Sequence, residues 1–241
     1  MAEPLVLVPG VLCDYRLFDD QLRVLGRDRA VTIAPVTTGE RMEEIASDLL
    51  TQLPQKFALA GMSFGGGVAM EIFRRAPDRV TRIALISTSP LADTPQQSAA
   101  REPVLVMARA GRMEEAVREI MRPEYLAPGP ARLGVLSAYV RMGVEMGPEV
   151  LTRQIRALQR RRDQQATLRK IRVPALVMCG AEDGMTPVKR HEFMAELIPT
   201  SRLAVIDGAG HLLPMEQPAR MTEELARWLK QPNVQPQVAG R

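Results

Sequence analysis

Histidine and cysteine are scarce in this sequence, which has two of each among 241 residues. The histidines, His191 and His211, stand far apart, and the chain has no H-x-x-x-H or C-x-x-C spacing of the kind that assembles metal sites. We therefore expect no metal and no cofactor. Cys13 and Cys179 are too few for a disulfide framework, which fits a reducing compartment, so we expect a cytoplasmic protein.

Long apolar runs and aromatic residues are missing as well. No run of about 18 apolar residues occurs, so we expect no membrane span. Residues 1–4 have no basic region and the apolar stretch after them is short, so we expect no signal peptide. Aromatic residues make up only 4% and the net charge of +4 is dispersed, so we expect no nucleic-acid partner. The arginines at 160–162 are interpreted as a solvated helix face.

Short apolar segments do occur, and they alternate with helical patterns. Buried strands are predicted at residues 5–8, 31–34, 57–62, 82–87, 174–179 and 202–206. Helical spacing of apolar residues predicts helices at 40–53, 64–76, 187–198 and 217–230. Because alternating strands and helices are typical of parallel α/β sheets, we expect about six strands, all parallel, flanked by helices.

The alternation is interrupted once. Residues 91–168 contain helical patterns and breakers but no convincing strand, which indicates a short helical cap inserted between two strands. The predicted organisation is therefore a core formed by residues 1–90 and 169–230, with the cap at 91–168. The tail at 231–241 has no periodicity and is predicted to be flexible.

The most informative motif is the pentapeptide Gly61-Met62-Ser63-Phe64-Gly65. It joins the predicted strand at 57–62 to the predicted helix at 64–76, which places Ser63 at the apex of a sharp strand-to-helix turn. Glycines at both flanks suit a turn in which strand and helix approach too closely for a Cβ atom. Ser63 is therefore a candidate nucleophile.

A serine hydroxyl needs a neighbouring base, and that base needs a group that orients it. His211 follows the strand at 202–206, at the strand end where parallel sheets bind ligands, and it is the candidate base. His191 is predicted to lie on the polar face of a helix. Asp183 follows the strand at 174–179 and is the candidate orienting acid, with Glu182 and Asp207 as rivals.

The glycine run at 65–67 invites other interpretations. A phosphate-binding loop would need a following Gly-Lys-Ser/Thr, which this chain lacks. A dinucleotide fingerprint would need G-x-G-x-x-G after the first strand, which is also absent.

The motifs together resemble the α/β-hydrolase superfamily, in particular its small bacterial branch of esterases, enol-lactonases and C–C-bond hydrolases. The resemblance covers about residues 4–230. It rests on Pro9-Gly10, Gly61-Met62-Ser63-Phe64-Gly65, Gly180-Ala181-Glu182-Asp183 with Pro187, and Gly210-His211.

Ser63, Asp183 and His211 occur in the chain order that the superfamily uses. The resemblance also implies an oxyanion hole made by the backbone amides of Val11 and Phe64, with Leu12 as the alternative if the loop is shifted by one. The chain departs from the superfamily in having Pro9-Gly10 where His-Gly is usual. It also lacks the antiparallel hairpin that often precedes the first parallel strand.

The resemblance implies a serine hydrolase that cleaves a small to medium ester or lactone through an acyl-enzyme. A C–C-bond hydrolase or a related lyase or synthase is the alternative on the same triad, and a non-catalytic ligand-binding protein of the same fold is a remote one. The expected partner is a small-molecule substrate, and a homodimer is left open. For a substrate with a carboxylate, Arg109, Arg141 and Arg161 are candidate contacts in the cap.

Overall fold

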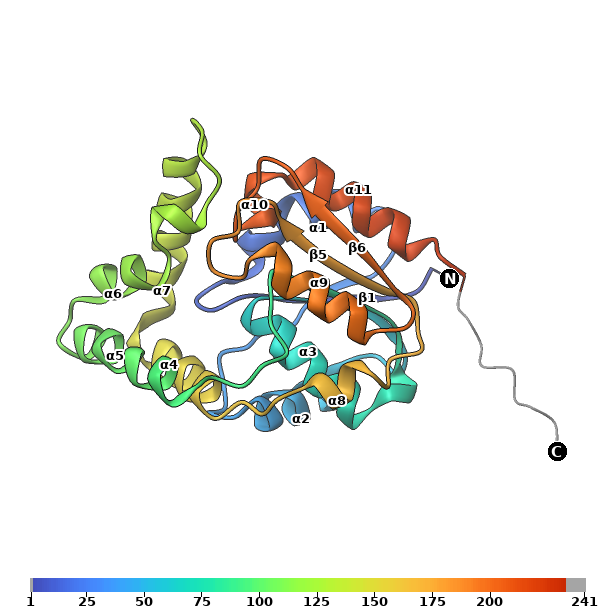
Figure 1. Ribbon diagram of the computed structural model, residues 1–241, viewed down its shortest axis with the longest axis horizontal. Helices are drawn as coiled ribbons and strands as arrows, with labels where there is room; N and C mark the ends of the chain where they lie inside the picture. The colour runs from blue at the N-terminus through green and yellow to red at the C-terminus, as the bar shows by residue number, and fades with distance from the viewer. Residues whose placement is uncertain (1, 233–241) are drawn as a thin grey trace.

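The protein is built on a single six-stranded sheet, which a computed structural model describes over residues 2–232 (Figure 1). The strand order is β2-β1-β3-β4-β5-β6, and every neighbouring pair is parallel. The strands are β1 Leu5–Val8, β2 Val31–Ile33, β3 Phe57–Met62, β4 Val80–Ile86, β5 Ala175–Gly180 and β6 Ser201–Ile206. The prediction of an α/β fold with six parallel strands is thus confirmed.

The central strands are apolar on both sides because both faces of the sheet are covered. Every residue of β1, β3 and β5 is buried, whereas the edge strands β2 and β6 keep partly exposed positions. Continuous apolar runs are what a parallel sheet between two helical layers requires. The same runs made these strands predictable from the sequence.

Two groups of helices cover the sheet (Figure 1). Helices α1 Asp19–Leu25 and α11 Pro218–Leu229 pack together on one face. The other face is covered by α2 Met42–Gln52, α3 Phe64–Arg75, α8 Gln165–Leu168 and α9 Val188–Leu197. Helices α2, α3, α9 and α11 begin and end within two residues of their predicted bounds, whereas α1 was not predicted.

The chain between β4 and β5 consists of helices, and we refer to residues 91–168 as the cap. Its helices are α4 Pro95–Ala100, α5 Glu102–Arg109, α6 Met113–Ile120, the 3-10 helix η3 Pro123–Tyr125, α7 Arg132–Gln159 and α8. Helices α4 to α7 form a layer of their own beside the core, whereas α8 returns to the core (Figure 1). Helix α7 is kinked at Gly147, whose φ of 81° and ψ of 172° are not helical, just before Pro148.

Two further findings concern membrane-spanning helices and the C-terminal tail. Within residues 2–232, no helix combines the length and apolar character that crossing a bilayer requires. Of the predicted tail at 231–241, residues 233–241 lie outside the described residues.

Candidate active site

Ser63 occupies the turn between β3 and α3, in a backbone conformation that non-glycine residues rarely adopt. Its φ is 52° and its ψ is −114°. A Cβ atom on Gly65 would lie 2.1 Å from the carbonyl oxygen of Val8, and one on Gly61 would lie 2.3 Å from that of Gly65. The turn therefore requires glycine at both flanks. Thr88, just beyond β4, donates a hydrogen bond from Oγ1 to the carbonyl oxygen of Ser63 at 2.7 Å.

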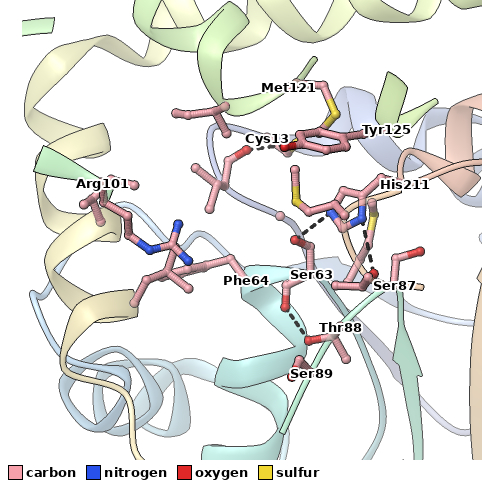
Figure 2. Close-up of a pocket in the computed structure, with 18 of the residues that line it drawn as sticks. Cys13, Ser63, Phe64, Ser87, Thr88, Ser89, Arg101, Met121, Tyr125 and His211 are labelled. Carbon is pink, nitrogen blue, oxygen red and sulfur yellow. Dashed lines mark hydrogen bonds between the residues drawn. The ribbon is translucent and has the colours of Figure 1, made fainter. Parts of the chain in front are cut away.

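His211 reaches Ser63 from the loop after β6. Its Nε2 atom lies 3.0 Å from the Oγ atom of Ser63, as Figure 2 shows. The backbone amide of His211 donates to the carbonyl oxygen of Tyr125 in the cap at 2.8 Å. A Cβ atom on Gly210 would lie 2.4 Å from that same oxygen, so the histidine loop and the cap are in close contact. The imidazole is buried, with the side chain only 2% exposed.

Asp183, after β5, lies on the other side of the imidazole. Both of its carboxylate oxygens are 3.1 Å from the Nδ1 atom of His211. The carboxylate also accepts hydrogen bonds from the amides of Met185 and Thr186 and from the Thr186 hydroxyl. Burial acts to raise its pKa, but the charge of His211 and these hydrogen bonds outweigh burial and lower the pKa to about 2. The carboxylate is therefore ionised at neutral pH.

The two rival acids lie elsewhere. The Glu182 carboxylate accepts hydrogen bonds from the amides of Gly208 and Ala209, at 3.4 and 3.1 Å. Asp207 is exposed to solvent. Of the three candidate acids, Asp183 is the one brought to His211.

The expectation for His191 was wrong. The residue is fully buried, because the inward face of α9 carries it together with Met194. Its Nε2 atom accepts a hydrogen bond from the Thr88 amide at 3.1 Å, and its Nδ1 atom lies 3.3 Å from the carbonyl oxygen of Pro187. Burial lowers its pKa from 6.5 to about 4, so the ring is neutral at neutral pH. His191 thus supports Thr88, which in turn supports the Ser63 turn.

The loop after β1 presents backbone amides beside Ser63. The amides of Val11 and Phe64 have no hydrogen-bond acceptor within the described chain, and both residues line the cavity in front of Ser63. The Leu12 amide, in contrast, donates to the Oε1 atom of Gln154 at 2.9 Å. That hydrogen bond occupies the Leu12 amide and leaves the Val11 amide without an acceptor among the described residues, while the oxyanion hole itself stays a prediction.

The cavity in front of Ser63 has a volume of about 380 Å³ and lies between core and cap. This volume lies at the small end of the usual range for ligand pockets, roughly 300–1,000 Å³. Met121 and Tyr125 of the cap lie over His211 in Figure 2. Cys13 also lines the cavity, but burial raises the pKa of its thiol, so the thiol stays protonated.

Of the three cap arginines proposed as contacts, Arg161 lines the cavity, whereas Arg109 and Arg141 do not. The Arg161 side chain is only 18% exposed, so the interpretation of residues 160–162 as a solvated face was wrong at position 161. Among residues 2–232, no three histidine, cysteine, aspartate or glutamate side chains are grouped as a metal site would need.

Three residues of the site escaped the sequence analysis: Thr88, Thr186 and Gln154. Thr88 lies two residues and Thr186 six residues beyond the end of a strand, and that position was an available signal. Gln154 lies within a cap helix, far along the chain from the loop that it contacts, and no local pattern marks it.

Comparisons with known proteins agree with this architecture. The sequence model described as "Alpha/beta hydrolase family" matches residues 5–224. A pimeloyl-[acyl-carrier protein] methyl ester esterase of Aromatoleum aromaticum is 29% identical over 78% of this chain and 81% of its own length. A putative carbamate hydrolase, RutD, of Pseudomonas savastanoi pv. phaseolicola is 26% identical over 93% of both chains.

Solved structures give the same result. A thermophilic esterase from Thermogutta terrifontis, solved with malate bound, superimposes with a TM-score of 0.85 and 28% identity, covering 95% of this chain and 90% of that one. The enol-lactonase from Burkholderia xenovorans LB400 shares the fold, with a TM-score of 0.83 and 22% identity over 96% and 92% of the two chains. The family match over most of the chain is decisive, and the protein belongs to the alpha/beta hydrolase family.

Proposed function

We propose that this protein is a serine hydrolase that cleaves a small to medium carboxylic ester or lactone through an acyl-enzyme. Ser63 is the nucleophile, His211 is the general base and Asp183 orients and stabilises the imidazole. The observation that carries the proposal is the continuous contact from the Ser63 hydroxyl through the His211 ring to the Asp183 carboxylate.

The proposed reaction begins with transfer of the Ser63 proton to Nε2 of His211 as Oγ attacks the carbonyl carbon. The ionised Asp183 stabilises the imidazolium that forms. The negative charge that develops on the carbonyl oxygen is met by the free amides of Val11 and Phe64. His211 then returns the proton to the departing alcohol oxygen, and the acyl group remains on Ser63.

Water completes the cycle. His211 takes a proton from a water molecule that attacks the acyl-enzyme, and the carboxylic acid leaves as Ser63 regains its proton. In a lactone, the alcohol and the acid are parts of one product molecule. Esters are favoured as substrates because the relatives described above include two esterases, and lactones because a lactonase shares the fold.

The test combines turnover with covalent labelling. Wild type should hydrolyse a short-chain chromogenic ester, and Ser63→Ala should lose this activity while keeping its circular dichroism spectrum. A fluorophosphonate probe should label wild type at Ser63. Ser87→Ala is the matched control, because Ser87 lines the same cavity and its loss should leave the labelling in place.

Undiminished turnover by Ser63→Ala would refute the assignment of the nucleophile. A wild-type protein that neither hydrolyses esters nor reacts with the probe would be a binding protein with the hydrolase fold.

A further inference from the structure

Three arginines from separate elements line the cavity in front of Ser63. Arg101 lies between α4 and α5, Arg161 lies just beyond α7, and Arg190 lies on α9 of the core. Figure 2 shows the Arg101 side chain pointing from the cap toward the space in front of Ser63.

A single carboxylate balances this group. Asp93 lies on the loop after β4 with its side chain only 1% exposed, and it pairs with both Arg101, at 2.7 Å, and Arg161, at 2.8 Å. Arg190 has a neutral partner, since its Nη1 atom donates to the Ser89 hydroxyl at 3.1 Å. Among the described residues that line this end of the cavity, three guanidinium groups are therefore accompanied by one carboxylate, which leaves an excess of positive charge.

Arg161 carries the clearest sign of a missing acceptor. Its Nε atom is buried and has no hydrogen-bond partner among the described residues. Burial lowers the pKa of Arg161, and the positive charges of Arg101 and Arg190 lower it further, although Asp93 acts to raise it. Buried donors without acceptors and cations without counterions are both costly, so the group is poised to bind an anion.

The other charged pair at the cavity does not contribute to this excess. Glu119 and Arg122 of the cap also line it, but they pair with each other and are about half exposed. A purely structural role, in which Asp93 joins two parts of the cap to each other, explains the contacts of Arg101 and Arg161 with Asp93. It does not explain Arg190 or the free Nε atom of Arg161.

We propose that Arg101, Arg161 and Arg190 form a subsite for a carboxylate on the substrate, so that the preferred substrates are esters or lactones whose acyl part carries a second, ionised carboxyl group. This inference rests on the proposed function and names its substrate class. A carboxylate suits the group because guanidinium binds it through two parallel hydrogen bonds.

The test compares esters that differ only in the distal group. Nitrophenyl half-esters of succinic, glutaric and adipic acid are each paired with the neutral nitrophenyl ester of the same acyl length. Wild type should prefer the charged member of at least one pair by about tenfold or more in kcat/KM, since charge-assisted hydrogen bonds are worth at least that. Equal rates, or a preference for the neutral member in all three pairs, would overturn the proposal.

Variants then assign the preference to the arginines. Arg161→Gln and Arg190→Gln should each reduce the charged-to-neutral ratio by about tenfold. Arg190→Gln matters most, because its loss breaks no ion pair that holds the cap. The matched control is Arg141→Gln, an exposed cap arginine that does not line the cavity, and its ratio should equal that of wild type. Unchanged ratios in both cavity variants would overturn the proposal.

Binding to Ser63→Ala separates this inference from the proposed function. Calorimetry with this variant needs no turnover, and the charged half-ester should bind about tenfold more tightly than its neutral counterpart. If wild type hydrolyses no ester but Ser63→Ala keeps that difference, the proposed function fails and the carboxylate subsite stands. If wild type hydrolyses both esters equally and the binding is equal, the subsite fails and the function stands.

Discussion

Gln154 in the cap holds Leu12 in the core loop beside the nucleophile, although 142 positions separate them in the chain. The Oε1 atom of Gln154 accepts from the Leu12 amide at 2.9 Å, and its Nε2 atom donates to the carbonyl oxygen of Val36 at 2.9 Å. Leu12 has a φ of 53°, a conformation that needs support from its surroundings. The glutamine thereby fixes the loop that presents the Val11 amide.

Replacement of Gln154 should therefore impair catalysis, although Gln154 does not line the cavity. Gln154→Leu keeps the volume but leaves the Leu12 amide buried without an acceptor, at a cost of about 1–3 kcal/mol in unfolding free energy. As the loop relaxes, we expect kcat for a short-chain ester to fall by about 10- to 100-fold. Steady-state kinetics check this.

The control is Glu149→Gln, an exposed position on the same helix, which should match wild type. A kcat for Gln154→Leu within about twofold of wild type would mean that the loop holds its conformation without the glutamine.

The role of Asp183 as the orienting acid can be tested by comparing its replacement with that of its neighbour Glu182. Asp183→Asn removes the charge that stabilises the imidazolium, and kcat should fall by about 10³–10⁴-fold while the fold is retained. Glu182→Gln should reduce kcat by no more than about threefold, because its carboxylate binds loop amides instead of His211. Equal losses in the two variants would contradict the assignment.

Gly65 and Gly67 should differ sharply in how much stability the protein loses when each is replaced by alanine. Gly65→Ala places a Cβ atom 2.1 Å from the Val8 carbonyl oxygen, which is backbone and cannot move aside. We expect a loss of about 3 kcal/mol or more in unfolding free energy.

Gly67 lies two residues further along α3, and a Cβ atom added there in Gly67→Ala meets only the flexible end of Met42, at 3.3 Å. Alanine also favours the helix by up to about 1 kcal/mol, so stability should stay within about 1 kcal/mol of wild type. Thermal unfolding of the two variants tests this prediction. Similar melting temperatures for Gly65→Ala and Gly67→Ala would show that the backbone around Gly65 can accommodate a Cβ atom.

His191 should make the protein sensitive to mild acid. Its pKa is about 4 in the folded protein, against an ordinary value of 6.5. The unfolded chain therefore takes up a proton first as the pH falls, so stability is complete above about 6.5 and declines toward 4. The shift corresponds to roughly 3 kcal/mol. Asp183 contributes in a separate, lower window, because its pKa falls from 3.8 to about 2 on folding.

Urea unfolding between pH 7 and pH 4 tests this prediction. Wild type should lose stability across the range, whereas His191→Gln, which keeps an acceptor for the Thr88 amide, should show a much flatter profile. Parallel profiles for the two proteins would assign the acid sensitivity to other groups.

The sheet was predictable because burial on both faces leaves a continuous apolar run, as in Leu5–Val8 and Phe57–Met62. The positions of Ser63, Asp183 and His211 were predictable for a related reason. Each follows a strand, and the carboxyl ends of parallel strands meet at one edge. The structure places the three side chains in contact there, while their catalytic roles remain a prediction.

Other features depended on contacts that the sequence does not display. His191 stands among Lys189, Arg190 and Glu192, and its charged neighbours hid its place on the inward face of α9. Arg161 lies in a run of arginines whose members have different surroundings once the cap folds. The partner of Gln154 belongs to another part of the chain, so only the tertiary structure could reveal it.

Helix α7 contacts the loop after β1 on both sides of its kink at Gly147. Tyr139, before the kink, donates its hydroxyl to the Val11 carbonyl oxygen at 3.2 Å, and Gln154, after it, binds the Leu12 amide. Lifting this helix from the core would break both bonds and free the loop. If Val11 supplies the oxyanion hole as proposed, we expect the site to be fully assembled only while α7 rests on the core.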